Sequence, residues 1–211
     1  FNVIQNKKFS KFDLRIQIPG KKKIIKNIRI PLLGLHNIRN ATSALAVSFS
    51  IGVTDKVIKF GLKNFKGVQR RFNYLFRKNS VPFFDDYAHH PTEISSVLDG
   101  VKEVYKSEEI ICIFQPHRIS RLKKLKLEFS KCFIKADTII LCPIYKAGEN
   151  IKLGFSYTSF ANSIARNSKV NLIMIKNEID LNKVIKNLSF GNKICIAMGA
   201  GSISNWIRNL I

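Results

Sequence analysis

The chain has 211 residues and a mass of 24.1 kDa, enough for one large domain or two small ones around a buried core. Hydrophobic residues make up 45% and aromatic residues 10%, which excludes an intrinsically disordered chain. No apolar run reaches the ~18 residues that a membrane span needs, so we expect no membrane insertion. The four cysteines show no CxxC spacing, which favours buried thiols in a cytoplasmic, reducing compartment over a zinc site or disulfides.

Positive charge dominates the chain, with 36 Lys and Arg against 14 Asp and Glu and a net charge of +22. Residues 1–67 hold 14 of the basic side chains, and residues 68–211 hold 22. DNA or RNA would gain from such a field. However, there is no long single-sign tract and no alternation of aromatic with basic residues. We therefore expect solvated basic faces and no nucleic-acid partner, with a basic nucleic-acid-binding α/β module as an alternative.

The first third of the chain predicts a hairpin followed by two helices. Alternating apolar residues predict a strand over 9–18, a turn at Pro19-Gly20 and a second strand over 24–30. Helical spacing predicts a helix over 37–51 and another that Thr54 begins and Gly67 closes. Four residues make up the apolar positions of this second helix: Val57, Ile58, Leu62 and Phe65. We place a domain boundary close to Gly67–Val68.

Beyond that boundary, strands and helices alternate regularly. The predicted strands are Phe72–Phe76, Val81–Asp85, Ile110–Phe114, Thr138–Cys142, Asn171–Ile175 and Lys193–Met198. The predicted helices cover residues 92–105, 121–133, 156–167, 179–188 and 202–210. This alternation predicts an α/β fold with a doubly wound, mostly parallel, Rossmann-like sheet that helices cover on both faces.

Four of these strands end in segments that are unusually rich in polar side chains. The segments are residues 86–93, 115–121, 143–149 and 199–202. Because parallel strands present their carboxyl ends at one edge, we expect all four segments to meet there. Each group of residues, taken singly, has an ordinary explanation as surface or turn residues. The groups are Asp85-Asp86, His89-His90, Arg118 with Arg121, and the glycine turn at 199–202. Their convergence on one edge favours a functional site.

Six strings carry a resemblance to a known family. They are GLHNIRNATSALA (34–46), FKGVQRRF (65–72), DDYAHHPTEI (85–94), FQPHRISR (114–121), YKAGE (145–149) and GAGSI (199–203). Together they resemble the Mur ligases of peptidoglycan synthesis, and Ile119 and Ser202 are the two small departures. The family's P-loop is not in this sequence. The resemblance therefore implies that 1–67 is the end of the central ATP-binding domain and that 68–211 is the C-terminal Rossmann-like domain.

The same resemblance implies an ATP-dependent amide ligation. Its partners would be ATP, UDP-N-acetylmuramate and L-alanine, and Mg²⁺ would be held by ligands outside this chain. A murein-tripeptide recycling ligase of the same family is the nearest alternative, although the FQPHR string argues against it. An inert scaffold is a further alternative, against which the joint presence of Asp86, His89 and Arg118 speaks.

Roles for individual residues also follow from the resemblance. The catalytic residues would be His89, Arg118 and Arg121. The ATP-binding residues would be His36, Asn37 and Asn40 at the adenine, Arg71 at the phosphates and Asp86 at the ribose. The substrate-binding residues would be Tyr87, His89, His117, Arg118, Arg121, Tyr145 and Glu149. No metal ligand is expected among them.

Overall fold

The computed structural model describes residues 1–18, 21–149 and 154–210. The chain forms two compact units, and the first division between them falls after Val68. Unit 1 contains residues 1–68 together with 99–105, and unit 2 contains residues 69–98 and 106–211. The assignment of these units to the domains of a ligase stays a prediction.

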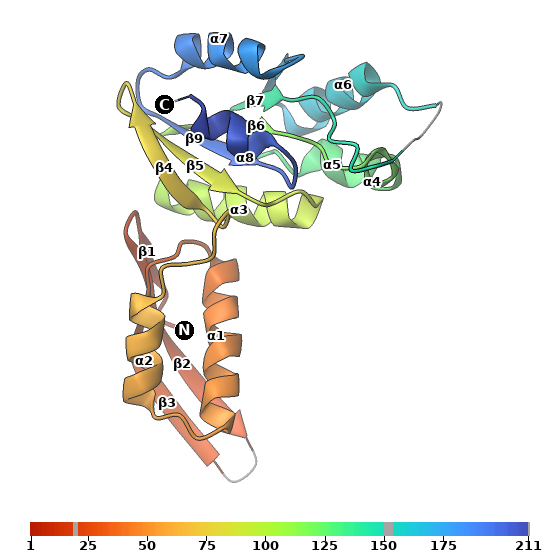
Figure 1. The fold of residues 1–211 in the computed structure, drawn as a ribbon. Coiled ribbons are helices and arrows are strands. Elements are labelled where there is room, and N and C mark those ends of the chain that lie inside the picture. The colour runs from red at the N-terminus through yellow and green to blue at the C-terminus, as the bar shows by residue number, and fades with distance from the viewer. Residues whose placement is uncertain (19–20, 150–153, 211) are drawn as a thin grey trace. The chain divides into compact units, whose positions relative to one another are not determined.

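Unit 1 contains the predicted hairpin and both predicted helices (Figure 1). Strands β2 (Phe9–Ile18) and β3 (Lys21–Ile30) pair antiparallel, and a short strand that the sequence did not reveal, β1 (Ile4–Asn6), pairs with β2. The helices are α1 (Leu35–Ser50) and α2 (Asp55–Asn64). The predicted turn at Pro19-Gly20 lies outside the described residues.

A β-bulge sets which side chains of the hairpin face the helices. The register between β2 and β3 shifts between Phe12 and Leu14, and Asn27 opposite adopts a left-handed φ of 59°. Because of the bulge, the buried positions of β3 change from odd-numbered to even-numbered residues, so that Ile25, Ile28 and Ile30 are all buried. The core of unit 1 consists of Phe12, Ile25, Ile28, Ile30, Ile38, Ala41, Leu45 and Ile58.

The apolar face that we predicted for α2 is only partly buried. Ile58 is buried and Leu62 packs against the core of unit 1. Val57 and Phe65, by contrast, are 57% and 45% exposed. Helical spacing identified the helix but not which of its apolar residues contact the strands.

Unit 2 is a six-stranded sheet in the order β4-β5-β9-β6-β7-β8. The strands are β4 (Asn73–Lys78), β5 (Val81–Asp86), β6 (Glu109–Phe114), β7 (Thr138–Leu141), β8 (Asn171–Met174) and β9 (Lys193–Met198). The helices are α3 (Pro91–Val104), α4 (Ile119–Lys124), α5 (Lys126–Lys131), α6 (Tyr157–Ser168), α7 (Glu178–Leu188) and α8 (Ile203–Arg208). Only the first part of α3, up to Leu98, belongs to unit 2. Every neighbouring pair from β5 to β8 in this order is parallel, as predicted.

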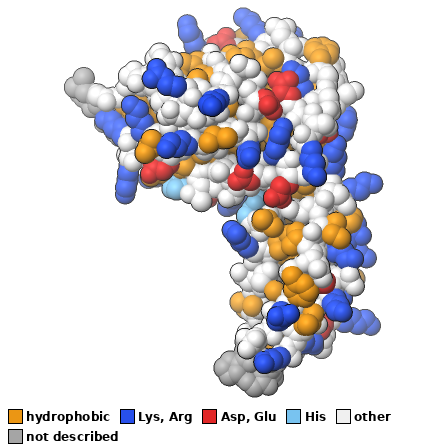
Figure 2. Space-filling view, turned by 180° about the vertical axis from the view of Figure 1, so that it is seen from behind, with side chains coloured by type: hydrophobic (Ala, Val, Ile, Leu, Met, Phe, Trp, Pro, Cys, Tyr) orange, Lys and Arg blue, Asp and Glu red, His pale blue; other side chains and the backbone are white. Residues whose placement is uncertain are grey.

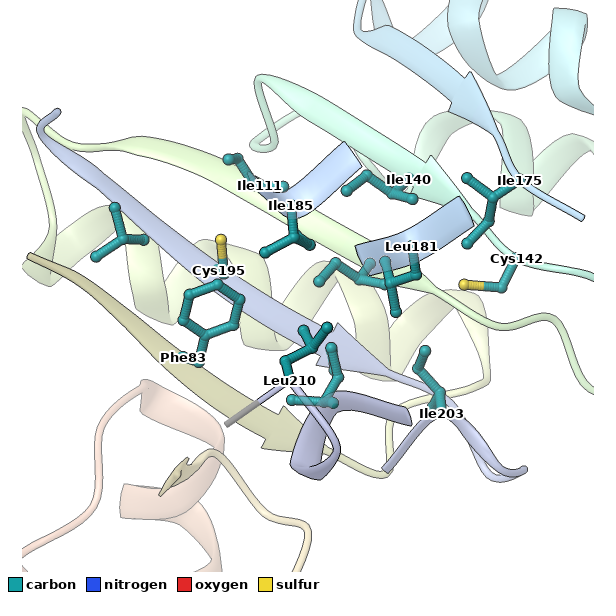
Figure 3. Packing of buried hydrophobic residues seen from close by; sticks show 14 residues of the cluster. Phe83, Ile111, Ile140, Cys142, Ile175, Leu181, Ile185, Cys195, Ile203 and Leu210 are labelled. Atoms are coloured by element: carbon teal, nitrogen blue, oxygen red, sulfur yellow. The ribbon is translucent and has the colours of Figure 1, made fainter. Parts of the chain in front are cut away.

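Helices cover both faces of this sheet because its central strands are apolar on both faces. One face carries Phe83, Ile111 and Ile140, which pack with residues of α7 and α8 (Figure 3). On the opposite face, the ring of Phe114 lies 5.9 Å from that of Phe129 in α5. Figure 1 shows α3 on the side of the sheet opposite α7 and α8. The prediction of a doubly wound sheet is confirmed.

Two details of unit 2 differ from the sequence prediction. Strand β4 runs antiparallel to β5, because Asn79 and Ser80 both adopt positive φ and make a tight hairpin. The predicted helix over 121–133 begins earlier, at Ile119, and is interrupted at Leu125, so that α4 and α5 are separate helices. No glycine or proline marks this interruption in the sequence.

Among the described residues, no helix is both long enough and apolar enough to cross a membrane. Figure 2 shows Lys and Arg side chains spread over the visible face rather than gathered in one stripe.

Candidate functional site

The polar segments that follow four strands meet at the carboxyl edge of the sheet in unit 2. Asp86 at the end of β5 pairs with Met198 at the end of β9, and Phe114 at the end of β6 pairs with the same residue. Phe114 also pairs with Leu141 at the end of β7. All four strands therefore end at the same level, and the expected convergence is confirmed.

Two of these segments are joined to each other by backbone hydrogen bonds. The Tyr145 N–H donates to the Pro116 carbonyl at 2.8 Å, and the Arg118 N–H donates to the Tyr145 carbonyl at 2.9 Å. The His117 ring stacks on the Tyr145 ring, with centroids 5.5 Å apart and planes at 15°. The segment after β7 thus supports the segment after β6, and His117 and Tyr145 share one surface.

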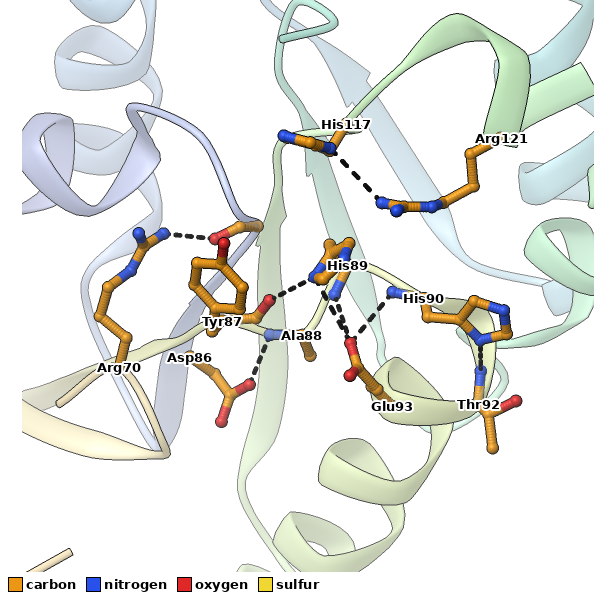
Figure 4. Close-up of polar contacts among 11 residues, drawn as sticks. Arg70, Asp86, Tyr87, Ala88, His89, His90, Thr92, Glu93, His117 and Arg121 are labelled. Atoms are coloured by element: carbon orange, nitrogen blue, oxygen red, sulfur yellow. Dashed lines mark hydrogen bonds and ion pairs between the residues drawn. The ribbon is translucent and has the colours of Figure 1, made fainter. Parts of the chain in front are cut away.

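His117 lies between Arg121 and His89. The Arg121 Nη1 is 3.4 Å from the His117 Nδ1, and the rings of His117 and His89 are 5.6 Å apart (Figure 4). Desolvation, together with the charges of Arg121 and Arg118, lowers the pKa of His117. His117 is therefore neutral at pH 7. Because a guanidinium can only donate, Nδ1 accepts and the ring proton lies on Nε2, which is a donor.

His89 has the opposite tautomer. Its Nδ1 lies 2.9 Å from the Tyr87 carbonyl and 3.5 Å from the Glu93 carboxylate. Both of these oxygens are acceptors, so Nδ1 carries a proton, and in the neutral form of the ring the lone pair lies on Nε2. Glu93 also accepts from the His89 and His90 backbone N–H groups, which caps α3 and fixes this turn. The neighbouring His90 Nδ1 faces the Thr92 N–H at the same helix start.

Arginine side chains lie beside Tyr87 on the other flank of the site. The Arg70 guanidinium lies 4.7 Å from the centre of the Tyr87 ring and donates to the Gly199 and Gly201 carbonyls. The exposed Arg71 lies 6.0 Å from the same ring. Sequence reasoning missed Arg70, although the FKGVQRRF string contains it. Its role here is to tie the glycine turn after β9 to the segment after β5.

Asp86 is buried, and its two carboxyl oxygens accept from the backbone. The Phe72 N–H donates to Oδ2 at 2.8 Å, and the Ala88 N–H donates to Oδ1 at 2.7 Å. Desolvation outweighs these hydrogen bonds and raises the pKa of Asp86 to about 6. Asp86 thus holds together the start of β4 and the end of β5. A contact with a ribose stays a prediction.

Gln115 is a second residue that sequence reasoning missed. Its buried side chain donates from Nε2 to the Ser202 Oγ and accepts at Oε1 from the Ile203 N–H, both at 3.0 Å. Gly201 packs directly against it, since a Cβ there would lie 2.4 Å from the Gln115 Oε1 and 2.6 Å from the Tyr145 Cγ. The glycine turn is therefore closely packed against the two neighbouring segments, which explains the glycine at position 201.

Arg118 and Glu149 complete the site in unit 2. Arg118 is exposed, with a left-handed φ of 67°, at the N-cap of α4. The Glu149 carboxylate accepts from the Ser120 N–H at 3.1 Å and from the Ser120 hydroxyl. These hydrogen bonds lower the pKa of Glu149, and the one from the hydroxyl has the larger effect.

Three of the predicted ATP-binding residues lie in unit 1, in the first turns of α1. Asn37 is buried, and its Nδ2 donates to the Leu33 carbonyl at 2.7 Å. One of the two N–H groups of the Asn37 side chain is therefore used within the fold. His36 is half-buried and Asn40 is exposed. Over residues 1–18, 21–149 and 154–210, no group of three or more His, Cys, Asp or Glu side chains could hold a metal ion.

Comparisons with known proteins agree with the resemblance. The profile of the family described as "Mur ligase, glutamate ligase domain" matches residues 70–201. The UDP-N-acetylmuramate–L-alanine ligase of Pelagibacter ubique is 60% identical over 99% of this chain and 45% of its own length. That of Mesorhizobium japonicum is 39% identical over 93% of this chain and 42% of its own length. This chain thus spans less than half the length of these two relatives.

Solved structures give the same result for the fold. The UDP-N-acetylmuramate-alanine ligase of Thermotoga maritima is 26% identical, with a TM-score of 0.75 over 97% of this chain and 43% of its own. A murein peptide ligase from Psychrobacter arcticus is 21% identical, with a TM-score of 0.63 over 97% of this chain and 41% of its own. The family profile covers well over half of the sequence and includes all of the four convergent segments except Ser202, so this chain belongs to the Mur ligase family.

Proposed function

We propose that this chain is part of an ATP-dependent ligase that joins L-alanine to UDP-N-acetylmuramate in peptidoglycan synthesis. The observation that carries the proposal is the cluster of His89, His117, Arg118 and Arg121 at the carboxyl edge of one parallel sheet. The names of the 60% and 39% identical relatives support the choice of substrates. The muramoyl carboxylate would attack the γ-phosphate of ATP, releasing ADP and giving an acyl phosphate. The alanine amine would then displace phosphate.

The tautomers of the two histidines suit the second step. The amine of alanine must lose a proton in order to form the amide bond. The lone pair on the His89 Nε2 can accept that proton, while Tyr87 and Glu93 hold the ring in place. The His117 Nε2–H can donate to a carboxylate or carbonyl oxygen of a substrate, and its neutral ring adds no charge there.

The arginines suit the anionic groups. Arg118 and Arg121 would bind the carboxylate of alanine and the acyl phosphate, because a planar guanidinium can donate two parallel hydrogen bonds to either group. Tyr87 and Tyr145 would complete the substrate surface beside the two histidines.

For ATP, we propose the residues that the resemblance names. His36, Asn37 and Asn40 would hydrogen-bond the adenine, Arg71 would contact the phosphates and Asp86 the ribose. Mg²⁺ would neutralise phosphate charge when bound.

A hybrid enzyme tests this function. The chain is substituted for the matching region of the Pelagibacter ubique relative, and ADP release from ATP is measured with UDP-N-acetylmuramate. We expect ADP release that requires L-alanine and is not supported by a murein tripeptide. Release with the tripeptide alone would favour the recycling ligase. If the hybrid releases no ADP with either L-alanine or the tripeptide, while the parent relative is active, the proposal is contradicted.

A further inference from the structure

We propose that Glu149 is a positioning residue that acts through Ser120 to hold Arg118 and Arg121, rather than a residue that contacts substrate. This inference rests on the proposed function and departs from the substrate role that the sequence suggested for Glu149. It follows from where the two carboxylate oxygens of Glu149 lie in unit 2.

Both oxygens of Glu149 are bonded to one residue of α4. The Ser120 N–H donates to Oε2 at 3.1 Å, and the Ser120 hydroxyl donates to Oε1. Ser120 lies between Arg118 and Arg121, so the carboxylate is bonded to the centre of the arginine segment. The pKa of Glu149 lies below its ordinary value because of these hydrogen bonds, so the carboxylate is ionised at pH 7.

The arginine segment needs such support from outside. Arg118 has a φ of 67°, a conformation that is unfavourable for a residue with a side chain, and it makes no side-chain hydrogen bond as the N-cap of α4. Backbone N–H groups in the first turn of a helix have no partner within the helix. Glu149 accepts from one of these groups, at Ser120, and so supplies from the next loop the cap that the segment lacks.

The loop that carries Glu149 is shaped to return to α4. Tyr145 is fixed by its two backbone hydrogen bonds to Pro116 and Arg118. Ala147 and Gly148 then adopt φ values of 50° and 81°, which reverse the chain. The Glu149 N–H closes the turn on the Lys146 carbonyl at 3.0 Å. The YKAGE segment thus contacts the arginine segment at both of its ends, through Tyr145 and through Glu149.

Charge also argues against direct contact between Glu149 and substrate. The groups that Arg118 and Arg121 are proposed to bind are a carboxylate and an acyl phosphate. An ionised carboxylate in contact with either group would repel it. Bonded to Ser120, the same carboxylate orders the arginines without contacting an anion.

Kinetics of the hybrid enzyme test this proposal with a double-mutant cycle. Glu149→Gln keeps the shape of the side chain but leaves one acceptor oxygen, and Ser120→Ala removes the hydroxyl. We expect each to lower kcat/KM for L-alanine about tenfold, the loss of one hydrogen bond to a charged group. The double variant should lose less kcat/KM than the product of the two single losses, and KM for ATP should be unchanged. Fold-losses that multiply in the double variant would overturn the proposal.

Amide hydrogen exchange on the 211-residue chain gives a readout that needs no activity. Glu149→Ala should speed exchange of the Ser120 amide at least about tenfold, because that amide loses its partner. The matched control is Glu128→Ala, which removes an exposed carboxylate from the neighbouring α5. Equal exchange in both variants would refute the proposal. An inactive unsubstituted hybrid would instead count against the proposed function, and the exchange result would still decide the role of Glu149.

Discussion

Replacing Gly201 by alanine tests whether the turn after β9 is packed as the structure shows. The added Cβ would lie 2.4 Å from the Gln115 Oε1 and 2.6 and 2.8 Å from the Cγ and Cβ of Tyr145. Gln115 cannot easily move away, because it is 2% exposed and bonded to Ser202 and Ile203. The Tyr145 ring is more exposed, but its backbone is bonded on both sides. One of these contacts must therefore yield.

The expected cost is that of an overpacked core position. Such insertions cost roughly 1–3 kcal/mol, and a loss near 2 kcal/mol lowers the Tm of a unit of this size by roughly 4–8 °C. Trp206 is the single tryptophan and packs against the core of unit 2, so its fluorescence reports on unit 2 alone. We expect the Tm of Gly201→Ala, followed by Trp206 fluorescence, to fall by that amount. The midpoint of urea unfolding should fall as well.

A second glycine provides the matched control. Gly61 lies in α2 of unit 1, and a Cβ there would meet nothing within 4 Å. Gly61→Ala should stabilise α2 by roughly 0.5–1 kcal/mol and leave the Trp206 transition unchanged. An unchanged Trp206 midpoint in Gly201→Ala would refute the packing of the glycine turn against Gln115 and Tyr145.

Three further outcomes are expected. In the hybrid enzyme, Arg118→Lys keeps the charge but removes the planar fork, so kcat/KM for L-alanine should fall at least tenfold, about 1.4 kcal/mol, with an unchanged Trp206 midpoint. The Asp86 carboxyl should titrate near pH 6 by ¹³C NMR, and a midpoint near its ordinary 3.8 would contradict its burial. The folded state keeps that proton to higher pH than the unfolded state. The contribution of Asp86 to the free energy of unfolding should therefore fall as the pH rises from about 4 to 6. The four cysteines are buried and burial raises the pKa of each thiol, so alkylation at pH 8 should be slow until denaturant is added.

The sequence was most informative where short-range patterns decide the structure. The period of apolar residues identified the strands, and the parallel sheet then placed His89, His117 and Arg121 at one edge without further information. The antiparallel β4 was not predicted, because the positive φ values of Asn79 and Ser80 decide that turn and neither residue is a glycine. The interruption at Leu125 has no local signal.

Roles that depend on long-range hydrogen bonds could not be predicted. Gln115 bonds to residues more than 80 positions away, and Glu149 bonds to Ser120 across 29 positions. No periodicity encodes such pairs. The resemblance selected Asp86 as a residue of interest, but only the structure shows that each of its oxygens accepts from a backbone N–H. Motifs thus indicated where the site is, and the structure indicates which side chains hold it in shape.

The order of strands in unit 2 has a consequence for how the chain folds during synthesis. Strand β9 is the last of the six to leave the ribosome, yet it lies between β5 and β6. Until residues 193–198 emerge, β5 and β6 each lack the neighbour that will join them and present an unpaired edge to other nascent chains. The six-stranded sheet can form only after β9 has been translated. A chain released without β9 would therefore hold β4–β5 and β6–β7–β8 as two separate partial sheets, each with an edge that can pair with a strand of another chain.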